Sequence, residues 1–191
     1  MKKIKLALLF FAVFVVSLIV FFPYRQFYTY LIDKNLKGQV NINYHIKTAS
    51  LFGIEFDTLK IEGVDAGRCR INLTPVGFIL HGRIASVLIS RGSFKAHFDV
   101  YFKKGFFVVK GSFPTQMLTY YLNKGYAVFL KNLNGNNQLY AKMSVKRNIV
   151  NIDTLKVAGD FELQGSGYVT KAGFRFMGYI KIGKIKQKIS L

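Results

Sequence analysis

The most constraining feature of this chain is an apolar run near its N-terminus. Residues 6–22 read LALLFFAVFVVSLIVFF, with no charged side chain and a single hydroxyl. A helix rises about 1.5 Å per residue, so this run would extend roughly 26 Å, close to the hydrocarbon core of a bilayer of about 30 Å. Lysines precede the run and Pro23 closes it. The run therefore predicts a helix that spans a membrane once.

A cleaved signal peptide is the competing interpretation of this run. A secretory apolar segment is usually about 7–15 residues long and ends at a pair of small residues. The run here is longer, and residues 21–24, FFPY, offer no small residue to a peptidase. An uncleaved anchor over residues 1–24 is therefore favoured. The lysines in front of it indicate a cytoplasmic N-terminus in the bacterial inner membrane, with residues 25–191 on the periplasmic side.

The charge of the chain points to an anionic partner. It carries 28 Lys and Arg against 9 Asp and Glu, a formal net charge of +19. Phospholipid headgroups, lipopolysaccharide and nucleic acid would all be attracted to such a protein. A periplasmic location argues against nucleic acid, and the basic residues are dispersed along the chain. A solvated polar face that is basic without a specific partner is the alternative interpretation.

The remainder of the chain is dominated by a period of two. Residues 25–38 come first and show apolar residues near helical spacing, which predicts a short amphipathic helix ending at Gly38. Apolar and polar residues then alternate over residues 40–46, 94–102, 138–145, 160–164 and 174–182. Such alternation indicates antiparallel strands with one dry face and one wet face. We therefore expect residues 39–191 to form one mainly β periplasmic domain, an elongated and curved antiparallel sheet.

Three segments interrupt this alternation. Residues 74–80 contain Pro and Gly, and this composition predicts a helical turn. Residues 113–122 place a proline near a helix start and apolar residues on one face, with Gly125 as the expected end. The short stretch 165–167, Gly-Ser-Gly, lies inside a strand pattern and is typical of a β-bulge.

The reactive side chains do not form a catalytic or metal-binding pattern. No histidine has a second histidine or a cysteine at metal-ligand spacing, and neither a phosphate-binding loop nor a nucleophile elbow occurs. Two carboxylate pairs share strand faces, and paired carboxylates can perform acid–base chemistry. Among so many lysines they are better interpreted as ion-pair partners. The pairs are Glu55 with Asp57, and Asp160 with Glu162. The sequence therefore predicts a protein that is not an enzyme, with no cofactor and no metal.

The single cysteine is expected to be structural. Cys69 alternates with Ile71 and Leu73, and this pattern favours a buried strand position over a reactive site.

The apolar face of the predicted sheet must be covered. The sheet either folds onto itself as a closed sandwich or curls into a trough whose cavity accepts another apolar group, such as acyl chains. The aromatic residues that would line such a groove are Phe94, Phe98, Phe102, Phe107, Phe174 and Phe176.

The chain also resembles a known family. The anchor is followed by residues 22–32, FPYRQFYTYLI, and then by residues 51–64, LFGIEFDTLKIEGV. Read in this order, these segments are similar to those of type II secretion system protein N. Segments 74–80, 111–114 and 163–169 also fit that family. It is similar in turn to AsmA-like envelope proteins, whose sheets form apolar troughs associated with lipid.

This resemblance implies a function. The chain would be a non-enzymatic accessory component of type II secretion or of a related envelope transport system for lipid or protein. Its partners would be the membrane, anionic lipid acyl chains and secretion-system proteins. The alternative is a purely structural β scaffold that docks envelope partners at its edge strands without binding lipid.

Overall fold

The structure is a computed structural model of the chain. It describes residues 2–36, 41–120, 130, 132–147, 149–170 and 173–190, and the side chains of 2–10, 18 and 174 are not included. The helices are α1 (Lys2–Phe21), α2 (Tyr24–Leu36), α3 (Val76–Ile79) and α4 (Thr115–Leu118).

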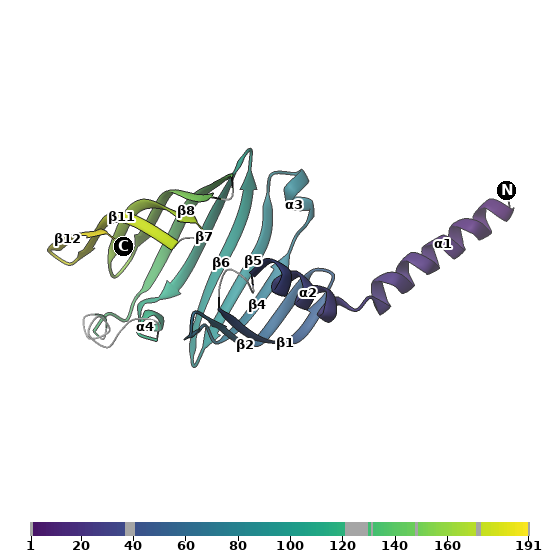
Figure 1. Ribbon diagram of the computed structural model, residues 1–191, viewed down its shortest axis with the longest axis horizontal. Coiled ribbons are helices and arrows are strands. Elements are labelled where there is room, and N and C mark those ends of the chain that lie inside the picture. The colour runs from purple at the N-terminus through teal and green to yellow at the C-terminus, as the bar shows by residue number, and fades with distance from the viewer. Residues whose placement is uncertain are drawn as a thin grey trace.

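The strands form one sheet (Figure 1). Their bounds are β1 (Ile42–Ser50), β2 (Gly53–Ile61), β3 (Val64–Asp65), β4 (Arg68–Leu73), β5 (Arg83–Arg91), β6 (Phe94–Lys103), β7 (Phe106–Pro114), β8 (Asn136–Lys146), β9 (Ile149–Ala158), β10 (Glu162–Thr170), β11 (Gly173–Ile182) and β12 (Ile185–Ser190). Each strand pairs antiparallel with its neighbours in sequence, except that β3 pairs only with β2, so β2 and β4 are adjacent. The prediction of a mainly β, antiparallel domain is confirmed. All described strands belong to this 12-stranded open sheet, and the described residues contain no second sheet that could close a sandwich.

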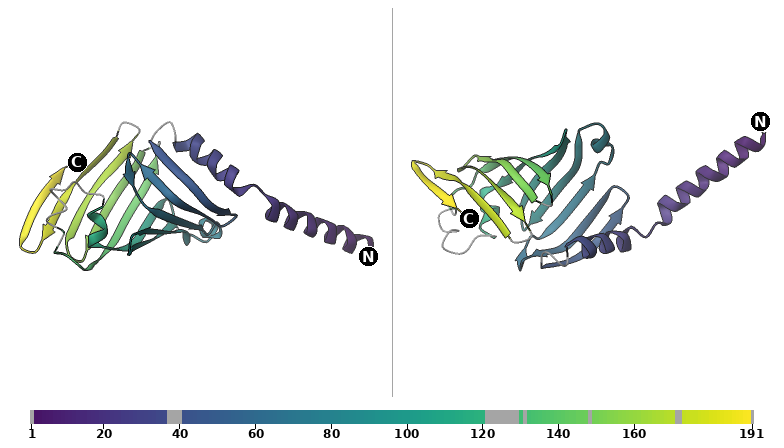
Figure 2. Two further views of the ribbon diagram at one scale, coloured as in Figure 1. Left: turned by 90° about the horizontal axis from the view of Figure 1, so that it is seen from below. Right: turned by 45° about the horizontal axis from the view of Figure 1, so that its top comes forward.

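One face of this sheet is apolar from strand to strand. The pairing register aligns one residue of each strand from β2 to β11 in a row: Ile54, Ile71, Val87, Phe98, Gly111, Leu139, Val157, Leu163 and Ile180. The sheet curves around this face (Figure 2). Phe113 at the end of β7 and Phe161 just before β10 have ring centroids 6.5 Å apart, although two strands separate β7 from β10. The apolar face is therefore the concave one.

Two short helices cover parts of the concave face. Tyr28 and Ile32 of α2 pack on the buried cluster that contains Ile46, Phe56 and Cys69. The Tyr28 hydroxyl also donates a hydrogen bond to the Ser50 carbonyl oxygen, at 3.1 Å. This helix confirms the prediction over residues 25–38 as far as Leu36, and Gly38 lies outside the described residues.

Met117 of α4 is only 3% exposed and packs on a second cluster with Ala96, Phe113, Val157 and Phe161. The predicted helix over residues 113–122 is correct at its centre, but its first residues belong to β7. Its expected C-terminal residues, and Gly125, lie outside the described part of the chain. The helical turn predicted over residues 74–80 is confirmed as α3.

Glycines on the concave face leave room for aromatic rings. A Cβ at Gly111 would collide with the ring of Phe98, and one at Gly165 would collide with the ring of Phe176. The predicted bulge at 165–167 corresponds to a register shift between β10 and β9. The extra residue is on β9, because three steps from Leu155 to Ile152 oppose two steps from Gly165 to Gly167.

The two N-terminal helices, α1 and α2, are separated by a bend. Among the residues described with their side chains, no single helix is both long and apolar enough to cross a membrane. Phe11–Phe21 and Tyr24–Leu36 have the required length and composition only as a pair, bent by 61°.

Candidate functional site: the concave face of the sheet

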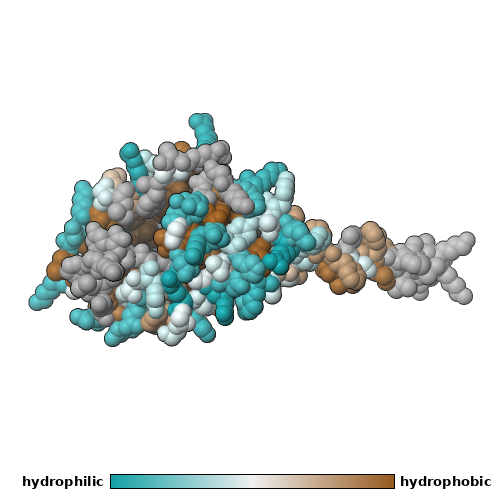
Figure 3. Space-filling model, turned by 60° about the horizontal axis from the view of Figure 1, so that its bottom comes forward, coloured by the Kyte–Doolittle hydropathy of each residue, from teal (hydrophilic) through white to brown (hydrophobic). Residues whose placement is uncertain are grey.

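The middle of the concave face is only partly covered. Outside the clusters under α2 and α4, several inward-facing residues are half-buried, among them Val100, Val109 and Leu155, although Ala141 in the same row is buried. The space-filling view shows a hollowed surface on which hydrophobic residues lie between hydrophilic ones (Figure 3). This arrangement forms an apolar trough, which we take as the candidate site.

The structure places the predicted groove residues at different points of this face. Phe94 and Phe98 are half-buried and pack against the cluster under α4. Phe102 and Phe107 are half-buried at the other end of their strands, with ring centroids 5.4 Å apart. These two pairs therefore do not form one continuous aromatic patch.

The last two groove candidates differ from the others. Phe176 faces the same side but is 2% exposed, so it serves as a packing residue over Gly165. Phe174 pairs in register with Val169, and its side chain lies outside the described part of the structure.

Several lining residues were missed by the sequence reasoning. The ring of Phe78 in α3 lies 5.5 Å from that of Phe102, and the His81 ring stacks on Phe102 at 5.7 Å. Met143 and Ile152 continue the row of Phe102 and Phe107 across β8 and β9, and both are half-buried. The apolar residues of β8 and β9 could have indicated Met143 and Ile152, because each of these strands places apolar residues at every second position over part of its length. Phe78 lies in a Pro/Gly-marked turn, which gives no such signal.

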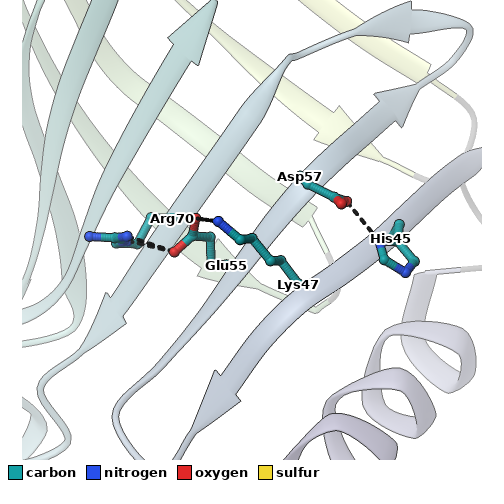
Figure 4. Close-up of polar contacts among 5 residues, drawn as sticks. All are labelled: His45, Lys47, Glu55, Asp57 and Arg70. Carbon is teal, nitrogen blue, oxygen red and sulfur yellow. Dashed lines mark hydrogen bonds and ion pairs between the residues drawn. The ribbon is translucent and has the colours of Figure 1, made fainter.

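The convex face carries the first carboxylate pair (Figure 4). Glu55 accepts hydrogen bonds from Arg70 at 2.6 and 3.1 Å, and Lys47 Nζ lies 3.5 Å away. These contacts, the Arg70 hydrogen bond foremost, hold the pKa of Glu55 below its usual value. Asp57 Oδ1 lies 2.8 Å from His45 Nδ1, and this hydrogen bond is the main cause of the lowered pKa of Asp57. The two carboxylates therefore engage separate partners. The ion-pair interpretation is confirmed for Glu55, whereas Asp57 hydrogen-bonds to His45, a contact that is an ion pair only when the histidine is protonated.

The second carboxylate pair is split between two roles. Glu162 pairs with Lys181 at 3.0 Å, as predicted. For Asp160 the interpretation is wrong. Its carboxylate accepts hydrogen bonds from the Thr115 hydroxyl at 2.6 Å and from the Gly135 backbone at 2.7 Å. Asn137 donates to the same hydroxyl at 2.7 Å, so these groups fasten the start of α4 to β8.

Two further carboxylates also lie beside basic side chains: Asp99 lies 3.5 Å from Arg83, and Asp65 lies 3.3 Å from Arg91. Among the described residues, no three His, Cys, Asp or Glu side chains are grouped so as to hold a metal ion. Cys69 is 3% exposed, which confirms its buried strand position, and burial raises the pKa of its thiol to about 11. Such a thiol stays protonated at neutral pH.

The trough can therefore do one thing chemically, which is to shelter apolar groups from water. Comparison of the chain with protein-family models, with curated proteins and with solved structures found no match.

Proposed function

We propose that this protein is a non-enzymatic, inner-membrane-anchored protein of the bacterial periplasm that binds lipid acyl chains in its trough. It would act as an accessory component of type II secretion or of a related envelope transport system. The anchor is residues 6–22, an uncharged run of helical length. The assignment to secretion rests on the resemblance of residues 22–32 and 51–64.

The observation that carries the lipid proposal is the half-buried middle of the concave face. A sheet with one dry face must cover that face with protein or with a ligand. Here α2 covers β1 and β2 and α4 covers one end of β6 and β7, while Phe102, Phe107 and Met143 stay partly exposed toward the other end of their strands. A row of partly exposed apolar side chains on a concave surface fits a linear apolar ligand such as an acyl chain.

The charge of the protein supports an anionic headgroup. The net charge of +19 attracts anionic lipids in the membrane that the anchor would cross. Burial of each methylene contributes about 0.8 kcal/mol, so affinity should rise about fourfold per added methylene until the trough is filled.

Photo-crosslinking in intact membranes tests the proposal. A photoreactive phenylalanine analogue is placed at Phe107, on the concave face, or at Tyr140, an exposed aromatic on the convex face. Lipid adducts, identified by mass spectrometry, are expected at position 107 and not at position 140. Equal yields at both positions, or no lipid at position 107, would remove the lipid-binding proposal and favour the structural scaffold.

One observation favours the alternative function, a structural scaffold. Strand β12 lies at the edge of the sheet and pairs only with β11 among the described strands, so a partner strand could add to it. Its outward lysines, Lys186 and Lys188, are typical of edges that are protected from such pairing. We therefore prefer the lipid-binding trough.

A further inference from the structure

Several turns lie side by side at one margin of the sheet. In an antiparallel sheet, every second connection lies at the same margin. The β1–β2 turn at residues 51–52 and the connection through α3 are joined there, because the Leu73 N–H donates to the Phe52 carbonyl oxygen at 2.6 Å. The β6–β7 turn lies beside them, since the Phe102 N–H donates to the Gly82 carbonyl oxygen at 2.9 Å. We call this margin the α3 rim; it comprises the β1–β2 turn, the connection through α3, the β6–β7 turn and the β8–β9 turn. It lies on the side of the sheet toward α1, and α4 lies on the opposite side (Figure 1).

The α3 rim exposes large apolar side chains. In α3 and just after it, Ile79 is 78% exposed and Leu80 is 72% exposed. Phe78 is 50% exposed, and Phe52 in the β1–β2 turn is 59% exposed. Large apolar side chains exposed along one margin are typical of a surface that contacts a partner or a membrane.

Two turns of the same rim carry basic side chains. Lys103 and Lys104 lie at the β6–β7 turn, and Lys146 and Arg147 lie at the β8–β9 turn. Within the described residues, no carboxylate oxygen lies within 4.0 Å of their side-chain nitrogens.

The opposite margin carries both basic and acidic side chains. It contains the ion pairs Arg91–Asp65, at 3.3 Å, and Lys181–Glu162, at 3.0 Å. Lys184, in the β11–β12 turn of the same margin, has no carboxylate within 4.0 Å among the described residues, so charge alone does not distinguish the α3 rim.

The α3 rim is continuous with the end of the apolar run. Leu51, in the β1–β2 turn, lines one recess together with Ile19, Phe22, Tyr24 and Phe27. The ring of Phe22 lies 4.9 Å from that of Tyr24 and 5.5 Å from that of Phe27. Aromatic residues of this kind gather at the interface between bilayer and water. If residues 6–22 span the bilayer, this recess brings the rim to the bilayer surface.

We infer that the α3 rim docks on an anionic bilayer surface, with its apolar side chains in the interface and its Lys and Arg side chains at lipid phosphates. This inference rests on the proposed anchor and gives the trough an entrance. The ring of Phe78 contacts that of Phe102, which contacts that of Phe107, so apolar contacts lead from the bilayer into the trough.

The absence of tryptophan from the chain allows a direct test. The F78W variant of the full chain is reconstituted into vesicles of phosphatidylcholine and phosphatidylglycerol with brominated acyl chains, which quench tryptophan fluorescence. The control is Y120W. The exposed fraction of Tyr120, 47%, is similar to that of Phe78, but Tyr120 lies after α4 at the opposite margin. Strong quenching and a blue-shifted emission are expected for F78W, with at least a threefold weaker effect for Y120W. Equal quenching in the two variants would overturn the inference.

Two further measurements separate this inference from the proposed function. Vesicle flotation reports the anchor: a chain that does not float overturns the anchor and the docking together, whereas a floating chain with unquenched F78W overturns the docking alone. Adding K103E and K104E to F78W should reduce quenching in the anionic vesicles while the chain still floats. Unchanged quenching would overturn the role of the lysines at lipid phosphates.

Discussion

Replacement of Phe176 by alanine separates packing from groove lining. Phe176 is 2% exposed and its ring lies over Gly165, which has no side chain that could fill the space. Phe→Ala changes at such positions cost about 3–5 kcal/mol because they leave a cavity. The neighbouring Met177 points to the opposite face and is 65% exposed, so Met177→Ala should change the free energy of unfolding by less than about 0.5 kcal/mol.

This difference is measurable by thermal unfolding. For a chain of about 150–250 residues, 1 kcal/mol shifts the melting temperature by about 2–4 °C. Phe176→Ala should therefore melt at least about 6 °C below both the parent protein and Met177→Ala, followed by circular dichroism of the strands. The half-buried Phe107 is the matched groove position, and Phe107→Ala should lose less stability while it lowers the yield of bound lipid. Melting temperatures of Phe176→Ala and Met177→Ala that agree within about 2 °C would refute the assignment of Phe176 to the core.

Three further predictions follow from other positions. Phe98→Asp should destabilise the sheet far more than Lys95→Asp, because it places a charge without a partner among apolar side chains; equal urea midpoints would contradict this. At pH 8, native Cys69 should react with iodoacetamide about a hundredfold more slowly than the unfolded chain, since burial raises its pKa to about 11 and blocks access. Glu55 has a lowered pKa in the folded protein, so its contribution is present above about pH 4.3, the usual pKa of Glu, and is lost as pH falls through the folded value. Glu55→Gln should therefore flatten the loss of stability in acid, and an unchanged acid slope would show that the Arg70 contact adds no stability.

The sequence by itself determined the local elements of this protein. A period of two depends only on which side chains alternate along one strand, so the strands around residues 40–46, 94–102 and 138–145 could be identified without their neighbours. Helical spacing identified α2 in the same way, and a Pro/Gly-marked break identified α3. The alternation along one strand also predicted the buried position of Cys69, and the excess of basic residues predicted that Glu55 and Glu162 would form ion pairs.

Only the tertiary structure decided how these elements meet. The curvature of the sheet accumulates over many strand pairs, and it is increased where β9 carries an extra residue, which no local pattern reveals. Packing across the sheet buries Phe176 over Gly165 and leaves Phe107 half-buried, although both occupy apolar positions of similar strands. Asp160 became a hydrogen-bond acceptor for Thr115 because the fold brings together segments 45 residues apart. The α3 rim likewise exists only because alternate turns of one antiparallel sheet fall on one margin, beside the end of the apolar run, and sequence spacing alone cannot bring Leu51 to Phe22.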